Sequence, residues 1–315
     1  MLHPKRCLLL GLAILGPGIA TAAEPSAPLF ASSAVTGQPF VGEFYVPAKG
    51  APRLGVLVLG GSEGGEPGGA KLLASHGYAA LSLAYFKAPG LPDTLELIPL
   101  EYCDRAIAWL EANPSMPRGG IVIEGSSKGA ELALLLAARH PDVVGVIATS
   151  PSAVVWQGIS KSFWPKPVPR SSWTVQAQPL PFVPYDYSHF FNPLDSRAIY
   201  KFYDRSLARK DAAAQAAIPV EKIHGPVLLF SGGDDALWPS AEMGDMIRDR
   251  LKAHGFAYKF EHIRYEHAGH TLNESYPVGG TPEGNRAARI ASKAKLFEFL
   301  QQLSPRPAES GAGSN

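Results

Sequence analysis

The feature that most constrains this fold is a regular alternation of short apolar runs with helix-like segments. The run Gly55–Leu59 (GVLVL) is apolar throughout, which is typical of a parallel strand covered on both faces. The segment Leu100–Ala112 instead carries apolar residues at helical spacing and ends before Asn113-Pro114. Because this alternation continues along the chain, it predicts an α/β fold with a mostly parallel sheet and helices on both faces.

The remaining elements follow from the same two patterns. We expect further strands at Phe40–Val46, Tyr78–Tyr85, Ile121–Ile123, Val143–Thr149, Val227–Ser231 and Ala257–Ile263. The first of these ends at Pro47, as an antiparallel edge strand would. We expect helices at Ala70–His76, Lys128–His140, Ala241–His254 and Asn285–Leu303.

The amino-terminal residues have the pattern of a cleavable secretory signal. Lys5 and Arg6 precede an apolar run at Cys7–Leu15, and Ala20-Thr21-Ala22 supplies small residues for cleavage. The apolar run is much shorter than the ~20 residues that a membrane-spanning helix needs. We therefore expect 1–22 to be a signal peptide, and the mature protein to be periplasmic or secreted, without stable insertion in a membrane.

The rest of the chain is expected to form one domain over 40–303, with a lead-in at 23–39 and a disordered tail at 304–315. Residues 151–218 interrupt the alternation and are rich in prolines. This segment also holds several aromatic residues, namely Trp156, Phe163, Trp164, Trp173 and Phe182. Since disordered linkers are poor in aromatic residues, we expect 151–218 to be a packed lid insertion over a site.

Composition excludes several classes of protein. With 46% hydrophobic and 18% charged residues and a formal net charge of +1, the chain is neither disordered nor basic enough to suggest nucleic-acid binding. Once the signal is removed, Cys103 is the remaining cysteine, so no internal disulfide is expected. Cys103 lies in an apolar helical stretch, and we expect an inert core thiol.

The motif that indicates chemistry is Gly125-Ser126-Ser127-Lys128-Gly129, placed directly after a strand and directly before a helix. A nucleophile elbow requires this setting, because a sharp turn lifts the central serine off the sheet. The flanking glycines let the strand and the helix pass closely, and the helix start directs N–H groups toward an oxyanion on Ser127. The alternative is a simple glycine-rich turn.

A nucleophilic serine needs a base in contact with it and an acid that orients the base. In folds with this elbow the acid and then the base follow later strands. We expect Asp235 to be the acid, because D-x-x-W-P resembles a pattern common at this position of α/β-hydrolases, with Asp234 as the alternate. We expect His270 to be the base, because Gly269-His270 precedes a turn, with His267 as the alternate.

An oxyanion hole needs two backbone donors. We expect these to be the amide of Lys128 and the amide of Ser62, in the glycine-rich loop Gly60–Gly65, with Gly61 left open as the second donor. This loop lacks the G-K-[ST] ending of a phosphate-binding P-loop. For Glu63 we favour a solvated loop carboxylate over a role in the site.

The two histidines of H-A-G-H could also suggest a metal site, with Glu266 or His262 as further ligands. However, the histidines lie on a glycine-containing loop, and the sequence places no further ligand cluster beside them. We expect no metal and no cofactor.

Several segments together resemble the catalytic domain of the acyl-CoA thioester hydrolases and bile acid-CoA:amino acid N-acyltransferase. These segments are GGSEGG, LSLAYFKAPGLP, IPLEYCDRAIAWL, GSSKGAELALLLA, SPSAVVWQG, SSWTVQAQPLPFVP, IPVEKIHGPVLLFSGGDDALWPS and HAGH. The resemblance runs from about Gly55 to Leu303. It implies an α/β-hydrolase fold and cleavage of an acyl thioester through a covalent acyl-enzyme, with the triad on Ser127, Asp235 and His270. A weaker resemblance extends to dienelactone hydrolases and small secreted esterases.

The chain departs from this family in two ways. Only 23–54 separate the expected signal from the first buried strand, so we expect no amino-terminal β-sandwich domain of the kind that animal members have. The acyltransferase has a cysteine nucleophile, whereas this chain has Ser127, which favours transfer to water.

We expect a small acyl ester or thioester as substrate. Because acyl-CoA is intracellular and the signal indicates export, the leaving group stays open. The alternatives are a secreted carboxylesterase or dienelactone-hydrolase-like enzyme, an acyltransferase to an amine, and a non-catalytic binding protein on the same fold.

Overall fold

The computed structural model describes residues 29–64, 69–117, 120–161, 168–188, 195 and 197–303. The expected signal peptide, 1–22, and the expected tail, 304–315, lie outside these residues. Phe163 and Trp164 of the expected lid also lie outside them.

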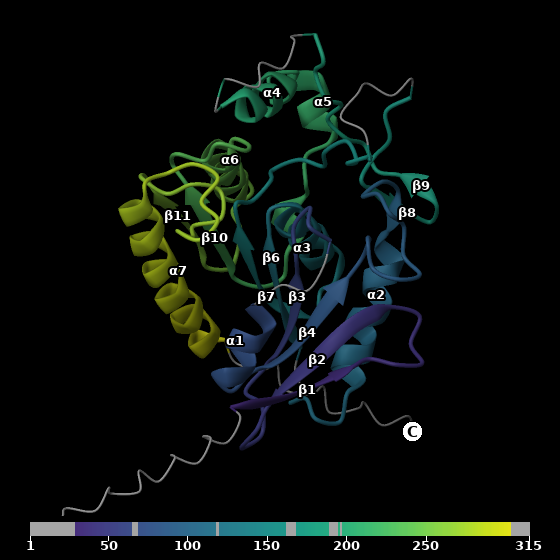
Figure 1. Cartoon of the computed structure of the whole chain (residues 1–315). Helices are drawn as coiled ribbons and strands as arrows, with labels where there is room; N and C mark the ends of the chain where they lie inside the picture. Colours follow the sequence, from purple (N-terminus) through teal and green to yellow (C-terminus); the bar gives the residue numbers. More distant parts are fainter. Residues whose placement is uncertain are drawn as a thin grey trace, which may run out of the picture.

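The described residues form a central sheet of eight strands in the order β1-β2-β4-β3-β6-β7-β10-β11 (Figure 1). Their bounds are Phe30–Ala34, Val41–Pro47, Ala79–Ala84, Gly55–Leu59, Ile121–Ser126, Val143–Thr149, Val227–Gly232 and Phe260–Tyr265, in that order. The first two strands pair antiparallel, and β2 also pairs antiparallel with β4. All pairs from β4 to β11 are parallel, which confirms the expected mostly parallel sheet.

Helices cover both faces of this sheet (Figure 1). One face packs against α2 (Leu100–Ala112), α3 (Lys128–Arg139) and α6 (Ser240–Ala253). The other face packs against α1 (Gly69–Ser75) and α7 (Pro282–Gln302). Side chains of one strand alternate between the two cores, so each buried strand must be apolar at every position. That requirement explains the continuous run GVLVL in β3.

Cys103 lies on α2 in the first of these cores and is fully buried. Burial raises the pKa of its thiol well above the usual value, which disfavours the reactive thiolate.

The expected edge position of the Phe40–Val46 strand is wrong. The strand, observed as β2, lies between β1 and β4, and β1 is the outer strand. Four of the five residues of β1 are exposed, so its sequence, FASSA, carries no burial pattern. A strand that buries so little leaves no periodic signal, which explains why the sequence predicts only a lead-in at 30–34.

Residues 151–218 contain secondary structure of their own. A small sheet joins β5 (Ile98–Pro99), β8 (Trp173–Val175) and β9 (Gln178–Pro179). The helices α4 (Ala198–Leu207) and α5 (Lys210–Gln215) follow, and a short 3-10 helix, η1, spans Val220–Lys222. Figure 1 shows α4 and α5 beyond one end of the central sheet. Trp156 and Trp173 are fully buried and belong to the same core as α2 and α3.

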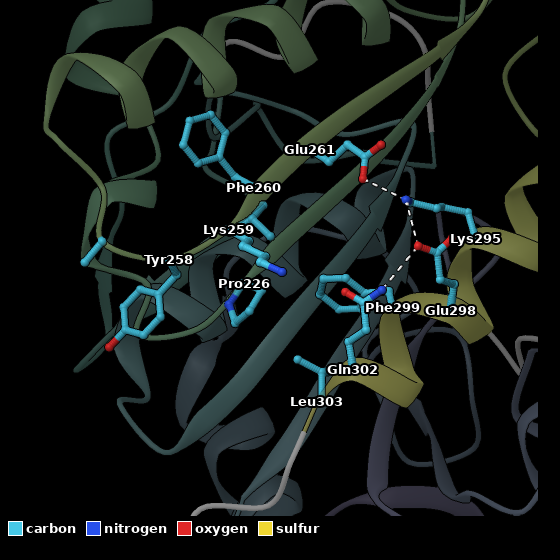
Figure 2. A pocket seen from close by; sticks show the side chains of 12 residues that line it. Pro226, Tyr258, Lys259, Phe260, Glu261, Lys295, Glu298, Phe299, Gln302 and Leu303 are labelled. Atoms are coloured by element: carbon cyan, nitrogen blue, oxygen red, sulfur yellow. Dashed lines mark hydrogen bonds and ion pairs between the residues drawn. The ribbon is translucent and has the colours of Figure 1, made fainter.

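A groove of about 750 Å³ lies along the outer strand β11 and the end of α7 (Figure 2). Its apolar side chains include Tyr258, Phe260 and Phe299. At its rim the Lys295 ammonium is 3.0 Å from the Glu261 carboxylate. None of the side chains that the sequence singled out for chemistry lines this groove.

Among the described residues, no helix combines the length and the hydropathy that crossing a membrane would require.

Candidate active site

Ser127 lies at a sharp turn between β6 and α3. Its backbone has φ 56° and ψ −119°, a conformation that is strained for a residue with a β-carbon. The Ser127 N–H donates to the carbonyl of Thr149, at 2.9 Å, which ties the turn to the end of β7. A β-carbon on Gly125 would lie 2.1 Å from the Gly129 carbonyl oxygen, so the strand and the helix approach too closely for a side chain. The local geometry is therefore that of a nucleophile elbow.

We predict that Gly129→Ala destabilises the fold by about 1–3 kcal/mol or more. The new β-carbon would lie 2.2 Å from the Leu59 carbonyl oxygen and 2.3 Å from that of Gly60, so backbone must shift. Gly69→Ala is the matched control, because its β-carbon would meet its nearest heavy atom at 3.4 Å. Urea unfolding followed by circular dichroism measures both; equal midpoints for the two variants would contradict the prediction.

The structure brings three predicted side chains together. The Ser127 hydroxyl oxygen is 2.9 Å from His270 Nε2, and His270 Nδ1 is 2.8 Å from a carboxylate oxygen of Asp235. The three residues follow β6, β10 and β11, so the carboxyl ends of parallel strands at one edge of the sheet position them. They are 8%, 5% and 2% exposed for Ser127, His270 and Asp235. This geometry matches the hydrogen-bonded chain of a serine nucleophile, its base and an orienting acid.

The loop after β10 fixes the Asp235 carboxylate. One of its oxygens accepts from the backbone amides of Leu237, at 2.8 Å, and Trp238, at 3.2 Å. The other oxygen accepts from the Ser240 hydroxyl at 2.6 Å and faces His270. With this many donors the carboxylate is well suited to orient an imidazole.

The loop after β11 fixes His270. Its backbone N–H donates to the Val278 carbonyl at 3.0 Å, and the Ser150 hydroxyl donates to its backbone carbonyl. The Trp238 ring contacts the imidazole edge to face, with the ring centroids 5.7 Å apart. These contacts set the position of the imidazole beside Ser127.

The two alternates do not lie at the elbow. The His267 imidazole is 3.9 Å from the Asp234 carboxylate, and their side chains are 79% and 52% exposed. These two side chains pair with each other at the surface. His270 and Asp235, in contrast, are the histidine and the aspartate that lie at Ser127.

His262, considered above as a metal ligand, makes a different set of contacts. Its Nε2 is 2.7 Å from the Ser231 hydroxyl, and its Nδ1 is 3.1 Å from Asp245. Over the described part of the chain, no three side chains of the His, Cys, Asp or Glu types gather as metal ligands would.

The glycine-rich loop after β3 lies beside Ser127. A β-carbon on Gly61 would be 3.1 Å from the Ser127 β-carbon. The Tyr85 hydroxyl donates to the carbonyls of Gly60, at 2.5 Å, and Gly61, at 3.2 Å, and the Lys87 ammonium donates to the Ser62 carbonyl at 2.9 Å. Burial raises the pKa of Tyr85, so its hydroxyl stays a donor.

Glu63 is closer to this arrangement than the sequence suggested. Its side chain is exposed, but its carboxylate accepts from the Gly61 N–H at 2.6 Å. The Gly61 amide is therefore engaged within the loop, whereas the Ser62 amide has no acceptor among the described residues.

Sequence reasoning used the backbone of Lys128 and missed its side chain. The Lys128 ammonium forms a buried ion pair with Glu131, at 2.5 Å, one helical turn away. Burial lowers the pKa of Lys128 and raises the pKa of Glu131, and each partner's charge opposes the shift of the other. The K-x-x-E spacing at the start of α3 was the available signal, but alone it also fits a solvated pair.

A second, partly buried acid lies near the elbow. Glu124 is on β6, where it pairs with Val58 of β3 and Ile147 of β7. A β-carbon on Gly69 would be 3.4 Å from its carboxylate. Burial raises the pKa of Glu124 from 4.5 to about 7.

We predict that Glu124→Gln raises the free energy of unfolding at pH 8 and changes it little at pH 4. The folded carboxyl binds its proton more tightly than the unfolded one, so the parent loses stability as pH rises from 4.5 to about 7. The expected gain at pH 8 is about 1–3 kcal/mol. Urea unfolding at both pH values measures it, and a variant with no gain at pH 8 would show that Glu124 is ionised without cost.

Comparison with known proteins places the chain in a family. Residues 98–279 match the family described as "BAAT / Acyl-CoA thioester hydrolase C terminal". Acyl-coenzyme A amino acid N-acyltransferase 2 of Mus musculus is 28% identical over 276 residues, which cover 83% of this chain and 62% of that relative. Acyl-coenzyme A thioesterase 1 of Mus musculus is 29% identical over 275 residues, with 82% and 62% covered. The chain thus spans about three-fifths of the length of these curated relatives.

Solved structures show the same fold at low sequence identity. A putative dienelactone hydrolase from Klebsiella pneumoniae superposes with a TM-score of 0.53 at 16% identity, covering 87% of this chain and 99% of that chain. A puromycin-hydrolyzing peptidase from Mycobacterium tuberculosis gives 0.56 at 12% identity, covering 91% and 42%. The sheet and its helices therefore form an α/β-hydrolase fold. Because the family match covers more than half of the sequence, the chain belongs to the BAAT / acyl-CoA thioester hydrolase C-terminal family.

Proposed function

We propose that the protein is a serine hydrolase that cleaves small acyl esters or thioesters through a covalent acyl-enzyme. The observation that carries the proposal is the hydrogen-bonded chain from Ser127 through His270 to Asp235 at a strained turn. Family membership supports acyl transfer as the reaction class.

In the proposed mechanism, His270 Nε2 takes the proton from Ser127 as the hydroxyl oxygen attacks the acyl carbonyl carbon. Asp235 holds the imidazole by Nδ1 and stabilises its positive charge. The backbone amides of Lys128 and Ser62 bind the oxyanion that forms. The imidazolium then protonates the departing alcohol or thiol, leaving the acyl group on Ser127.

In the second half of the reaction, His270 takes a proton from water while the water oxygen attacks the acyl-enzyme. The carboxylic acid leaves, and the proton returns to Ser127. No metal or cofactor enters these steps.

A fluorophosphonate probe tests the reaction class. The parent protein should become labelled, Ser127→Ala should not, and Ser126→Ala should be labelled like the parent, because Ser126 precedes the turn on β6. A folded parent that is not labelled would favour the alternative of a non-catalytic binding protein.

The leaving group is tested separately. We propose the thioester class because curated relatives are named acyl-coenzyme A thioesterases, and oxygen esters as the alternative. A panel of acyl-CoAs, p-nitrophenyl esters and natural carboxylic esters on the mature protein measures kcat/KM for each. A protein labelled at Ser127 that hydrolyses oxygen esters at least tenfold better would be a carboxylesterase or a dienelactone-hydrolase-like enzyme.

Transfer to an amine is a second candidate, because other relatives are named N-acyltransferases. The same acyl-CoA assay, run with and without glycine or taurine, separates free acid from amide by product analysis. We propose water as the acceptor, so the free acid should remain the product when either amine is present.

The expected signal peptide leads us to propose that the protein is exported. Fractionation of cells that make the full chain, with amino-terminal sequencing of the recovered protein, tests this. A chain that keeps 1–22 and stays with the cytoplasmic fraction would contradict it.

A further inference from the structure

The insertion at 151–218 is hydrogen-bonded to a buried ion pair on α3, the helix that follows Ser127. The Lys128 and Glu131 side chains are 2% and 0% exposed, and both belong to the first turn of α3. Their further polar partners come from the insertion. The Lys128 ammonium donates to the Ser172 hydroxyl at 2.8 Å, and one Glu131 oxygen accepts from Trp173 Nε1 at 2.7 Å and from the Trp156 N–H at 3.1 Å.

Such a pair is a costly way to attach a segment. Both charges lose their hydration, and an apolar pair of similar size would often hold the fold equally well. What the charges add is direction, because each hydrogen bond fixes the distance and orientation of the group that it binds. Here the groups that are fixed are the indole of Trp173 and the backbone of Trp156, whose own indole N–H has no partner among the described residues.

Each of the two tryptophans is linked to the surroundings of Ser127 through one intermediate aromatic residue. The Trp173 ring packs against Tyr85, with centroids 5.7 Å apart, and the Tyr85 hydroxyl binds the carbonyls of Gly60 and Gly61 in the loop beside the serine. On this side, the position of one indole is linked to the loop that holds the proposed oxyanion donor.

The other indole lies toward the base. The Trp156 ring stacks on Trp238, with centroids 6.4 Å apart, and Trp238 contacts His270 edge to face. Tyr203, on α4, lies edge-on to both tryptophans, at 5.0 and 5.7 Å. Trp156 and Trp173 of the insertion, like Trp238 of the loop after β10, are each at most 1% exposed and belong to one core. The two insertion tryptophans therefore form a close-packed aromatic wall behind the residues that contact His270 and the loop after β3.

We propose that Glu131 is a positioning residue for acyl-group selection: its carboxylate holds the Trp156 and Trp173 wall against the elbow and so limits the acyl group that Ser127 can carry. The inference rests on the proposed function, because a wall can select acyl groups only if Ser127 becomes acylated. According to this proposal, a short acyl group on Ser127 fits beside the fixed wall, whereas a longer acyl group requires the wall to move.

The test compares two esters with one leaving group, p-nitrophenyl acetate and p-nitrophenyl octanoate, so that the ratio of their kcat/KM values reports the acyl group alone. In Glu131→Gln, which keeps the shape and loses the charge, this ratio should shift about tenfold toward the octanoate. Trp173→Phe, which removes the indole N–H, should shift it the same way. Near-ultraviolet circular dichroism should show weaker indole signals in Glu131→Gln, because the indoles lose fixed packing.

An apolar double variant and a matched control complete the design. Lys128→Met/Glu131→Leu removes both charges and leaves the Trp156 and Trp173 N–H groups without an acceptor, so it should melt below the parent. At a temperature where it is folded, it should show the same shift in ratio. Asp104→Asn is the control, because it breaks a partly exposed pair between α2 and Arg139 of α3 that holds no residue of the insertion. Its ratio should equal the parent's.

The outcomes separate the two proposals. If the parent is not labelled by a fluorophosphonate, the proposed function fails. If the parent is labelled and the folded variants keep its ratio, lose both activities equally, or move toward the acetate, Glu131 does not act on acyl selection.

Discussion

Replacing Ser127 with alanine is expected to lower kcat toward p-nitrophenyl acetate by about 10⁴- to 10⁶-fold while leaving the fold intact. The reason is that the hydroxyl is the atom that forms the covalent bond in the proposed mechanism. The oxyanion donors are backbone groups and remain in the variant, so a small residual rate above that of water should persist. Steady-state kinetics with the mature protein measures the loss, and thermal melting checks the fold.

Ser126→Ala is the control for this substitution. Ser126 ends β6 and stands next to Ser127, yet no part of the proposed mechanism uses its hydroxyl. Its kcat should stay within a few-fold of the parent value. Comparable losses in the two serine variants would indicate a general disturbance of the turn instead of loss of a nucleophile.

Asp235→Asn should lower kcat by about 10⁴-fold. In the folded protein the Asp235 carboxylate accepts a hydrogen bond from His270 Nδ1, two from amides of its own loop and one from the Ser240 hydroxyl at the start of α6. An amide at this position favours the wrong imidazole tautomer, with the proton on Nε2, where the base must accept the proton of Ser127. The loss should appear in kcat for every substrate of the panel, because it acts on the base and not on substrate recognition.

Asp234→Asn is the matched control, one residue away and with the same change of atoms. Its carboxylate is half-exposed and faces His267 at the surface, so kcat should change by less than about threefold. If the Asp234 variant lost as much as the Asp235 variant, the assignment of the acid would be wrong.

The sequence predicted the sheet because most of its strands must satisfy two cores at once. A run such as GVLVL in β3 is apolar at every position because both of its faces are buried, and this pattern indicates a central strand of a parallel sheet. The outer strand β1 was not predicted, because most of its side chains are exposed. Exposed positions accept polar residues of many kinds, so they leave no strand pattern in the sequence. Strands are thus predictable in proportion to what they bury.

The part of the candidate site that could be predicted is the part where close packing of the backbone permits only particular residues. Gly125 and Gly129 have no room for a β-carbon, so the elbow leaves a mark in the sequence. The bond from Gly61 to Glu63 and the ion pair of Lys128 left no such mark, because a charged residue near a loop or helix start is normally solvated. For the insertion, aromatic content was the signal that predicted packing, and the sequence did not predict that the insertion packs against the start of α3.

The contacts of His262 have a consequence for searches that identify enzymes with a structural template of active-site atoms. Ser231, His262 and Asp245 repeat the residue types and nearly the distances of Ser127, His270 and Asp235, within one chain. Yet Ser231 is fully buried within strand β10 and does not lie at a tight turn that would present its hydroxyl. A template search that scores interatomic distances alone would return both constellations. Adding solvent access and a left-handed nucleophile backbone to the template would rank them apart.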